Sequence, residues 1–301
     1  MSAIIGGKDA KQAGIRESAL AASVRPRLDP VVALCLFACA LLLAGALLAP
    51  LIAPFDPDAQ RLLARLRPPA GFERADARHL LGTDQLGRDL LSRCLHGLRL
   101  SLALAFFGAV VGLALGSLLG ILAGFSGGLL DDLVMGAVDV KLSMPFTLVA
   151  LLVIALAGAT IPVLVVVLGL AYWAHFARLV RAQIIALRDL PYIEAARAAG
   201  ASSAGIVWRH MLPNIVSPVI LMFTLNVSNL ILLESSLSFL GLGVQPPTAS
   251  LGSMVGQGRD YMASAPWIVA APALLIVLVA LVVMLLGDWL RDQFDVRLQE
   301  R

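Results

Sequence analysis

The residues that could carry chemistry are few, and the motif for ATP hydrolysis is absent from the sequence. Hydrolysis of ATP requires a phosphate-binding loop of the form GxxxxGK[ST], which does not occur. Gly6, Gly7 and Lys8 lack the rest of that motif. HExxH does not occur, and the three cysteines and four histidines show no metal-ligand spacing. We therefore expect no catalytic residue, no bound cofactor and no metal in this chain.

Two acidic residues lie within apolar runs, where an ionisable group is costly and is a candidate for function. Asp139 lies near the start of its run, and we expect it to pair with Lys141 or Arg178. Glu234 lies deeper in its run. Four neutral polar residues share its expected helix: Asn226, Asn229, Ser235 and Ser236. These five side chains either line a path through the membrane or hold neighbouring helices together by hydrogen bonds, and the sequence supports both interpretations.

The segment 189–214 lies between two long apolar segments and is too polar to cross a membrane. Asp189 is suited to cap a helix, and Pro191 fits a first helical turn, where its missing N–H is not needed. The alanine-rich run 193–199 predicts a short helix, and Gly200 predicts the left-handed turn that ends it.

A second helical run is expected at 203–210, and Leu212 with Pro213 is expected to end it. The short helix carries one acid, Glu194, in an otherwise basic segment. Its small side chains would let the backbone of another protein approach closely: Ala195, Ala196 and Ala199. The sequence thus predicts a helix, a sharp glycine turn and a second helix across one end of a bundle.

Composition places the chain in a membrane. Of its 301 residues, 59% are hydrophobic and only 14% are charged, and the mean hydropathy is +0.88. Soluble domains have about a quarter of their residues charged. The net charge of +3 comes without a basic and aromatic cluster, so nucleic acid is not an expected partner. We classify the chain as an all-α polytopic membrane protein.

Six apolar runs are long enough to cross a lipid bilayer as helices. They are 31–53 and about 100–124, 133–156, 161–180, 215–240 and 268–286. The basic tail 1–30 predicts a cytoplasmic N-terminus, and six spans then place the C-terminal tail 291–301 on the same side. The loop 54–98 falls outside the cell in this count, although its seven arginines oppose the positive-inside tendency. The core of five helices is expected at 99–290.

Two patterns describe the second span and its approach. Asp89, Arg93 and His96 recur at helical spacing, which predicts an amphipathic helix leading into the span. Glycines then occur at every fourth position: Gly108, Gly112, Gly116 and Gly120. Such a stripe of small residues predicts a closely packed helix face in lipid.

Three strings resemble one family. Glu194-Ala195-Ala196, then Gly200, Ile206 and Leu212-Pro213, resemble the EAA loop of permease subunits from binding-protein-dependent ABC importers. The string at 79–102, with Gly82-Thr83-Asp84, and the string ILLESSLSFLGLGVQPP at 231–247 are similar to the dipeptide, oligopeptide and nickel branch of that family. The resemblance covers about residues 31–298.

The resemblance implies a MetI-like ABC importer permease fold with six transmembrane helices in a bacterial inner membrane. It implies that the segment 189–213 is a coupling loop that docks on a cytoplasmic ATPase subunit. The residues concerned are Tyr192, Glu194, Ala195, Ala196, Ala199, Gly200, Leu212 and Pro213. The implied partners are a homologous second permease subunit, two ATPase subunits that bind ATP and magnesium, and an extracytoplasmic solute-binding protein.

The expected substrate is a dipeptide or a short oligopeptide, with nickel or glutathione as the alternative within the family. An ion-coupled secondary transporter or an intramembrane enzyme is the alternative outside it. The two halves of the sequence do not read as inverted copies, which weighs against a secondary transporter.

Overall fold

The computed structural model describes residues 30–299, with side chains through residue 293. The expected tail 1–30 therefore lies almost wholly outside the described residues. The described residues form helices and no strand. The helices are α2 (Pro30–Leu47), α3 (Ala49–Ile52), η1 (Leu62–Ala64), α4 (Leu90–Ser126), α5 (Gly128–Ser143), α6 (Phe146–Ala157), α7 (Ile161–Arg188), α8 (Pro191–Ala198), α9 (Ser203–Ile206), η2 (Val207–Met211), α10 (Leu212–Phe239), α11 (Leu251–Gly258), η3 (Arg259–Tyr261) and α12 (Trp267–Gln299).

Five helical segments in the described part are long and apolar enough to cross a membrane: α2, α4, α7, the continuous run from α9 to α10, and α12. The remaining expected span, 133–156, which is the third in the chain, is not one straight helix. Its residues belong to α5 and α6, which meet at an angle of 93°. Met144 is extended, with φ −91° and ψ 136°, because the ring of Pro145 disfavours helical geometry in the residue before it. The count is six only if this bent pair is taken as one span.

The glycine stripe of α4 packs against α7, as predicted. A Cβ atom on Gly116 would lie 2.2 Å from the carbonyl oxygen of Trp173, and one on Gly120 would lie 2.6 Å from that of Ala177. Real Cβ atoms essentially never approach so closely, so the two backbones meet at a distance that only glycine permits. Gly124 extends the stripe by one more turn.

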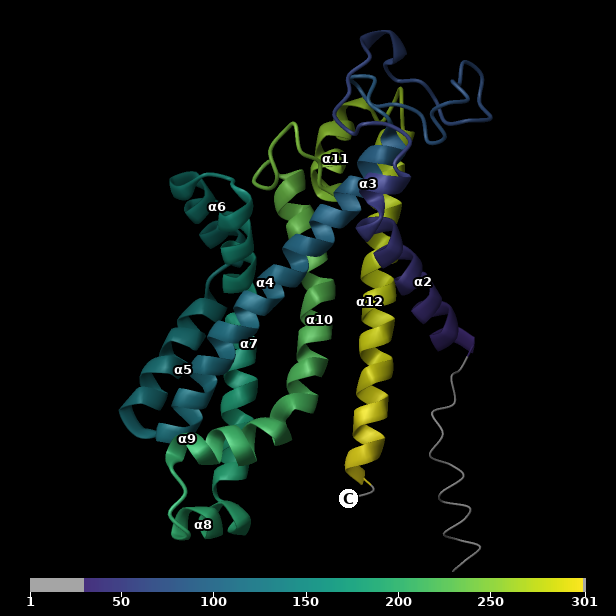
Figure 1. Ribbon diagram of the computed structural model, residues 1–301. Coiled ribbons are helices and arrows are strands. Elements are labelled where there is room, and N and C mark those ends of the chain that lie inside the picture. The colour runs from purple at the N-terminus through teal and green to yellow at the C-terminus, as the bar shows by residue number, and fades with distance from the viewer. Residues whose placement is uncertain (1–29, 300–301) are drawn as a thin grey trace, which may run out of the picture.

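The bundle has two distinct ends (Figure 1). The loop 53–89 and α11 lie at one end, and α8 lies at the other, together with the end of α12. The buried apolar core between these ends is formed mainly by side chains of α4, α7, α10 and α12. The helix α12 runs to Gln299, so most of the expected C-terminal tail 291–301 is helical.

The loop 53–89 is fastened to the start of α4 by buried polar groups. Asp89 caps the helix, because its carboxylate accepts hydrogen bonds from the backbone N–H and the hydroxyl of Ser92 at 2.8 and 2.7 Å. The His79 ring lies 2.8 Å from the same carboxylate. The predicted amphipathic helix is therefore the first part of α4, and the loop ends at residue 89 instead of 98.

Candidate functional site

The short helix α8 begins one residue later than a cap at Asp189 would place it. Leu190 is the N-terminal cap residue, with φ −79° and ψ 142° and no side-chain capping bond, while Asp189 ends α7. The prediction that Asp189 caps this helix was wrong. Pro191 does occupy the first turn, as expected, and it holds the residue before it in an extended conformation.

One face of α8 is anchored and the other is free. Ile193 is fully buried in an apolar cluster. The other buried members of that cluster come from α7, α9, η2 and α10: Val180, Ile184, Ile206, Met211 and Ile215. Glu194, Ala195 and Ala199 are exposed. The helix is therefore fixed to the bundle through one side chain and presents small residues to its surroundings.

Gly200 ends α8 in the left-handed conformation that the sequence predicts. Its φ is +84°, its N–H donates to the Arg197 carbonyl at 3.0 Å, and the Ala201 N–H donates to the Ala196 carbonyl at 3.1 Å. This pair of hydrogen bonds is the Schellman motif. A Cβ atom at Gly200 would meet no atom of this chain within 4 Å. The glycine is therefore required by backbone geometry, and the space beside it is open.

The second helical run does not end at Leu212 and Pro213. Residues Val207–Met211 form a turn of π-helix, and α10 starts directly after it. The Leu212 N–H donates to the Val207 carbonyl, and Pro213 follows in the first turn of α10, where a missing N–H is tolerated. The expected stop is therefore a bend through which the run continues into a membrane helix.

One residue at this end, Trp208, was not singled out from the sequence. Trp208 in the π-helical turn is 73% exposed, which is unusual for so large an aromatic side chain. Arg188 donates a hydrogen bond to the Gly124 carbonyl at 3.3 Å and so joins the end of α7 to the end of α4. Tyr192 is 43% exposed, and its ring centroid lies 6.4 Å from that of His210. A tryptophan in a polar loop was the available sequence signal.

Glu234 is buried and connects three helices. It accepts hydrogen bonds from the hydroxyls of Ser101 at 3.0 Å and Ser238 at 2.7 Å. The Ser101 oxygen in turn accepts the N–H of Leu251 at 3.2 Å. These bonds join α10 to α4 and α11. In this conformation Glu234 holds neighbouring helices together, which is one of the two roles expected for it.

The four other polar residues predicted with Glu234 make no hydrogen bond to it. Asn226 and Ser235 are buried, and their side-chain Nδ2 and Oγ atoms have no hydrogen-bond partner among the described residues. Asn229 and Ser236 are exposed, and the Ser236 hydroxyl donates to the Leu232 carbonyl within the helix. A role of these residues in translocation stays a prediction.

Ion pairs tie the bent pair of helices to α7. Asp139 pairs with Arg178 at 2.7 Å, which confirms one of the two expected partners. Lys141 instead donates to the Ala171 carbonyl. Asp131 forms a two-pronged contact with Arg181. Asp139 therefore takes part in a contact between helices.

Known proteins similar in sequence to this chain include permease proteins of peptide and glutathione transport systems. The family described as "Binding-protein-dependent transport system inner membrane component" matches residues 116–300, more than half of the chain. The di/tripeptide transport system permease protein DppC of Pseudomonas aeruginosa is 42% identical over 254 residues, covering 84% of each chain. The glutathione transport system permease protein GsiD of Pectobacterium atrosepticum is 40% identical over 259 residues, covering 86% of this chain and 84% of the relative.

A solved structure shares the fold. The MetNI methionine ABC transporter in an inward facing conformation matches with a TM-score of 0.54 and 23% identity, over 68% of this chain and 96% of that one. This agrees with the MetI-like fold expected from the sequence. The family match, the extent of the similar relatives and the shared fold point the same way, and the chain belongs to the family of binding-protein-dependent transport system inner membrane components.

Proposed function

We propose that this chain forms half of the pore of an ATP-driven importer of dipeptides or short oligopeptides. The other half is a homologous permease subunit, two cytoplasmic ATPase subunits bind ATP and magnesium, and an extracytoplasmic binding protein delivers the substrate. The observation that carries the proposal is α8, a short helix with an exposed small-residue face, anchored by Ile193 at one end of the bundle.

In this proposal α8 is the coupling helix. A displacement of α8 is transmitted through the buried Ile193 cluster to the adjoining ends of α7 and α10. It is transmitted to α4 through the Arg188 hydrogen bond and the glycine stripe. Such close-packed contacts transmit displacement because well-packed interiors are poorly compressible. The two faces of the pore then open in turn as the ATPase pair closes and separates.

ATP must supply the energy of this transition. Changing a two-state equilibrium from 1:99 to 99:1 requires a difference of about 5.5 kcal/mol in binding between the two states. A substrate that must leave the pore cannot bind one state so much more tightly and still be released. Nucleotide binding to the partner subunits is therefore the source of the shift.

The proposal includes an orientation. The end of the bundle that carries α8 and the end of α12 faces the cytoplasm, and the loop 53–89 faces outward (Figure 1). Its arginines are partly neutralised at short range: Arg88 pairs with Asp84 at 2.6 Å, and Arg78 with Asp76 at 2.8 Å. The helix α2 is the one candidate span described before this loop. A single crossing by α2 therefore places the N-terminus on the cytoplasmic side.

The substrate class rests on relatives that are named as dipeptide or di/tripeptide permeases. Glutathione is the second candidate, because a relative of nearly equal identity is named for it. Both are small peptides with free carboxylates. Nickel is the third substrate expected for this branch.

Uptake by the complete assembly tests the proposal. The chain is reconstituted with its partner permease, both ATPase subunits and the binding protein in liposomes, and radiolabelled Ala-Ala, glutathione and Ni²⁺ are supplied in turn. We expect ATP-dependent uptake of Ala-Ala and no uptake by this chain alone under a proton or sodium gradient. Gradient-driven uptake by the chain alone would identify a secondary transporter instead.

A further inference from the structure

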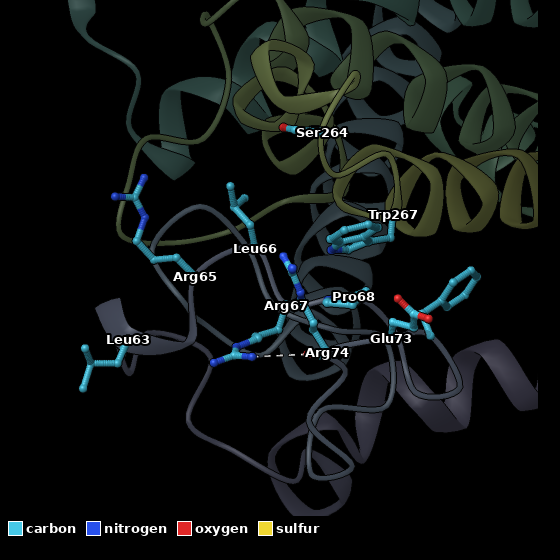
Figure 2. A pocket seen from close by; sticks show the side chains of 10 residues that line it. Leu63, Arg65, Leu66, Arg67, Pro68, Glu73, Arg74, Ser264 and Trp267 are labelled. Carbon is cyan, nitrogen blue, oxygen red and sulfur yellow. Dashed lines mark hydrogen bonds between the residues drawn. The ribbon is translucent and has the colours of Figure 1, made fainter.

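A cavity of about 690 Å³ lies on the loop 53–89, at the end of the bundle away from α8 (Figure 2). Most of its wall comes from residues 63–74, and the rest comes from Ser264, just before α12, and from Trp267, the first residue of α12. The volume is in the range of sites for small molecules. This cavity was not predictable from the sequence, because its two walls are almost 200 residues apart.

The cavity wall is basic. Three arginines line it: Arg65, Arg67 and Arg74. None of them pairs with a carboxylate among the described residues, whereas the neighbouring Arg78, Arg88 and Arg93 all do. The arginines of the cavity wall therefore keep their positive charge without a paired carboxylate, whereas the three neighbouring arginines are paired.

The three arginines differ in how far they are engaged. Arg65 donates to the Gln85 carbonyl at 2.7 Å, and one nitrogen of Arg67 donates to the Arg74 carbonyl at 3.3 Å. The Arg74 guanidinium makes no hydrogen bond or ion pair in the described part of the chain. Figure 2 shows it directed toward Leu66 and Trp267, while Arg65 is directed away from them. Arg74 is thus the principal free cation of the cavity wall, while the Arg67 guanidinium is directed to the Arg74 carbonyl (Figure 2).

The backbone at this cavity is held in an unfavourable conformation. Leu66 and Arg74 have φ of 52° and 65°, and they are the only residues other than glycine with positive φ in the described chain. Such a conformation is costly for a residue with a Cβ atom, and it persists only where the surroundings enforce it. Leu66 is fixed by its N–H to the Asp84 carbonyl at 3.1 Å, within the buried loop network. Both strained residues line the same cavity, which is typical of a binding site.

We propose that this cavity is an external binding site for a short zwitterionic peptide. The guanidinium group of Arg74 takes the terminal carboxylate, whose planar geometry it matches, and Arg67 adds positive charge to the same wall. Glu73 lines the same wall and offers a negative charge to the terminal ammonium group. Leu66 and Trp267 supply apolar surface for the peptide side chains. Glu73 disfavours a purely anionic ligand such as a phospholipid phosphate.

The choice of a peptide rests on the function proposed above, whereas the cavity and its charges do not. The site is separate from the membrane-embedded residues of α10. It would hold a peptide at the outer surface, where the substrate passes from the binding protein to the pore.

Binding of Ala-Ala to the purified full-length chain in phosphatidylcholine nanodiscs tests the proposal by calorimetry. Ala-Ala is expected to bind, and Ala-Ala amide, which has no carboxylate, is expected to bind about tenfold or more weakly. N-acetyl-Ala-Ala should show a smaller loss, because Glu73 is exposed and its attraction for the ammonium group is screened by water. Binding of the acid and the amide with equal affinity would overturn the proposal.

Matched variants locate the site. Arg74→Gln is expected to lower the affinity for Ala-Ala about tenfold or more, because it removes a charge-assisted contact and keeps the backbone carbonyl that Arg67 uses. Arg78→Gln is the control, because Arg78 lies four residues away, is paired with Asp76 and does not line the cavity. Thermal unfolding verifies that both variants fold. Equal affinities for Ala-Ala in both variants would remove the site from this cavity.

Two further outcomes separate this proposal from others. If nanodiscs containing phosphatidylglycerol lose Ala-Ala binding, the arginines serve a lipid headgroup and the peptide site is refuted. If the wild-type chain does not bind Ala-Ala at all, the external site is refuted, but ATP-driven uptake by the complete assembly is unaffected. Failure of the site and failure of the proposed function are therefore distinguished by separate measurements.

Discussion

The glycine that ends α8 allows backbone strain to be separated from contact with a partner. Gly200 has φ +84°, and a Cβ atom there would meet nothing in this chain within 4 Å. Gly200→Ala and Gly200→Trp therefore carry the same backbone penalty. They differ only in the bulk that they project into open space, where we expect an ATPase subunit to lie.

The size of the backbone penalty follows from the conformation. A residue with a Cβ atom pays about 1–2 kcal/mol in the left-handed region. Two hydrogen bonds hold the turn, from Gly200 and Ala201 to carbonyls of α8, and each contributes about 1 kcal/mol. The penalty is thus roughly offset, and Gly200→Ala should keep most of its transport. Gly200→Asn should lose less still, because asparagine tolerates this conformation.

The assay compares peptide uptake with ATP hydrolysis in liposomes that hold the complete assembly. We expect uptake by Gly200→Trp to fall at least about tenfold below that of Gly200→Ala, a difference of about 1.4 kcal/mol. ATP hydrolysis should continue in both variants, because the proposed function assigns the ATPase sites to other subunits. Equal uptake by the two variants would show that no partner approaches Gly200, and it would refute the docking geometry.

Three further predictions follow from single contacts. Glu194→Lys should uncouple ATP hydrolysis from uptake without removing the protein from the membrane, because Glu194 is exposed on the free face of α8; unchanged uptake would count against this. Gly116→Ala should destabilise the protein by about 1–3 kcal/mol, seen as a lower melting temperature in detergent, because its Cβ would collide with the α7 backbone. Gly136→Ala on α5 is the control and should not destabilise, since a Cβ there meets nothing within 4 Å; equal losses would contradict the packing argument. Glu234→Ala should lower the melting temperature by several degrees, because it breaks two buried hydrogen bonds. Glu234→Gln should retain both stability and uptake. If Glu234→Gln loses uptake while its stability stays normal, Glu234 belongs to the translocation path instead.

Features governed by local rules were predictable from the sequence. The glycine stripe requires only the four-residue spacing, and it does face α7. Gly200 was recognisable because a left-handed helix end strongly favours glycine. The anchoring of α8 through Ile193 was not predicted, because the cluster around it draws on four other elements.

Prolines were the main source of error. Three of them mark a break or a helix start: Pro145, Pro191 and Pro213. In each case the ring constrains the residue before it or removes one N–H, and the consequence depends on whether the next residues can start a helix. A helix continues after both Pro145 and Pro213. The single span expected at 133–156 is therefore a bent pair of helices, and the stop expected at Leu212 and Pro213 is a bend.

The cavity lined by residues 63–74 could not be predicted from the sequence for another reason. The loop 53–89 carries nearly balanced charges, and the sequence does not say which arginines find carboxylates. Arg88 and Arg93 are buried beside Asp84, whereas Arg74 is left without such a partner among the described residues. Only the fold of the loop decides this.

The central claim is that this chain is a gate moved from the cytoplasm by ATPase subunits that it contacts through α8. Cross-linking tests it most directly, with Ala195→Cys placed on the exposed face of α8 in a variant that lacks the three native cysteines. Leu63→Cys, 98% exposed at the opposite end of the bundle, is the control. The account predicts a cross-link from position 195 to an ATPase subunit and none from position 63. Labelling of position 195 from outside intact cells, or its failure to cross-link to any ATPase subunit, would contradict the account.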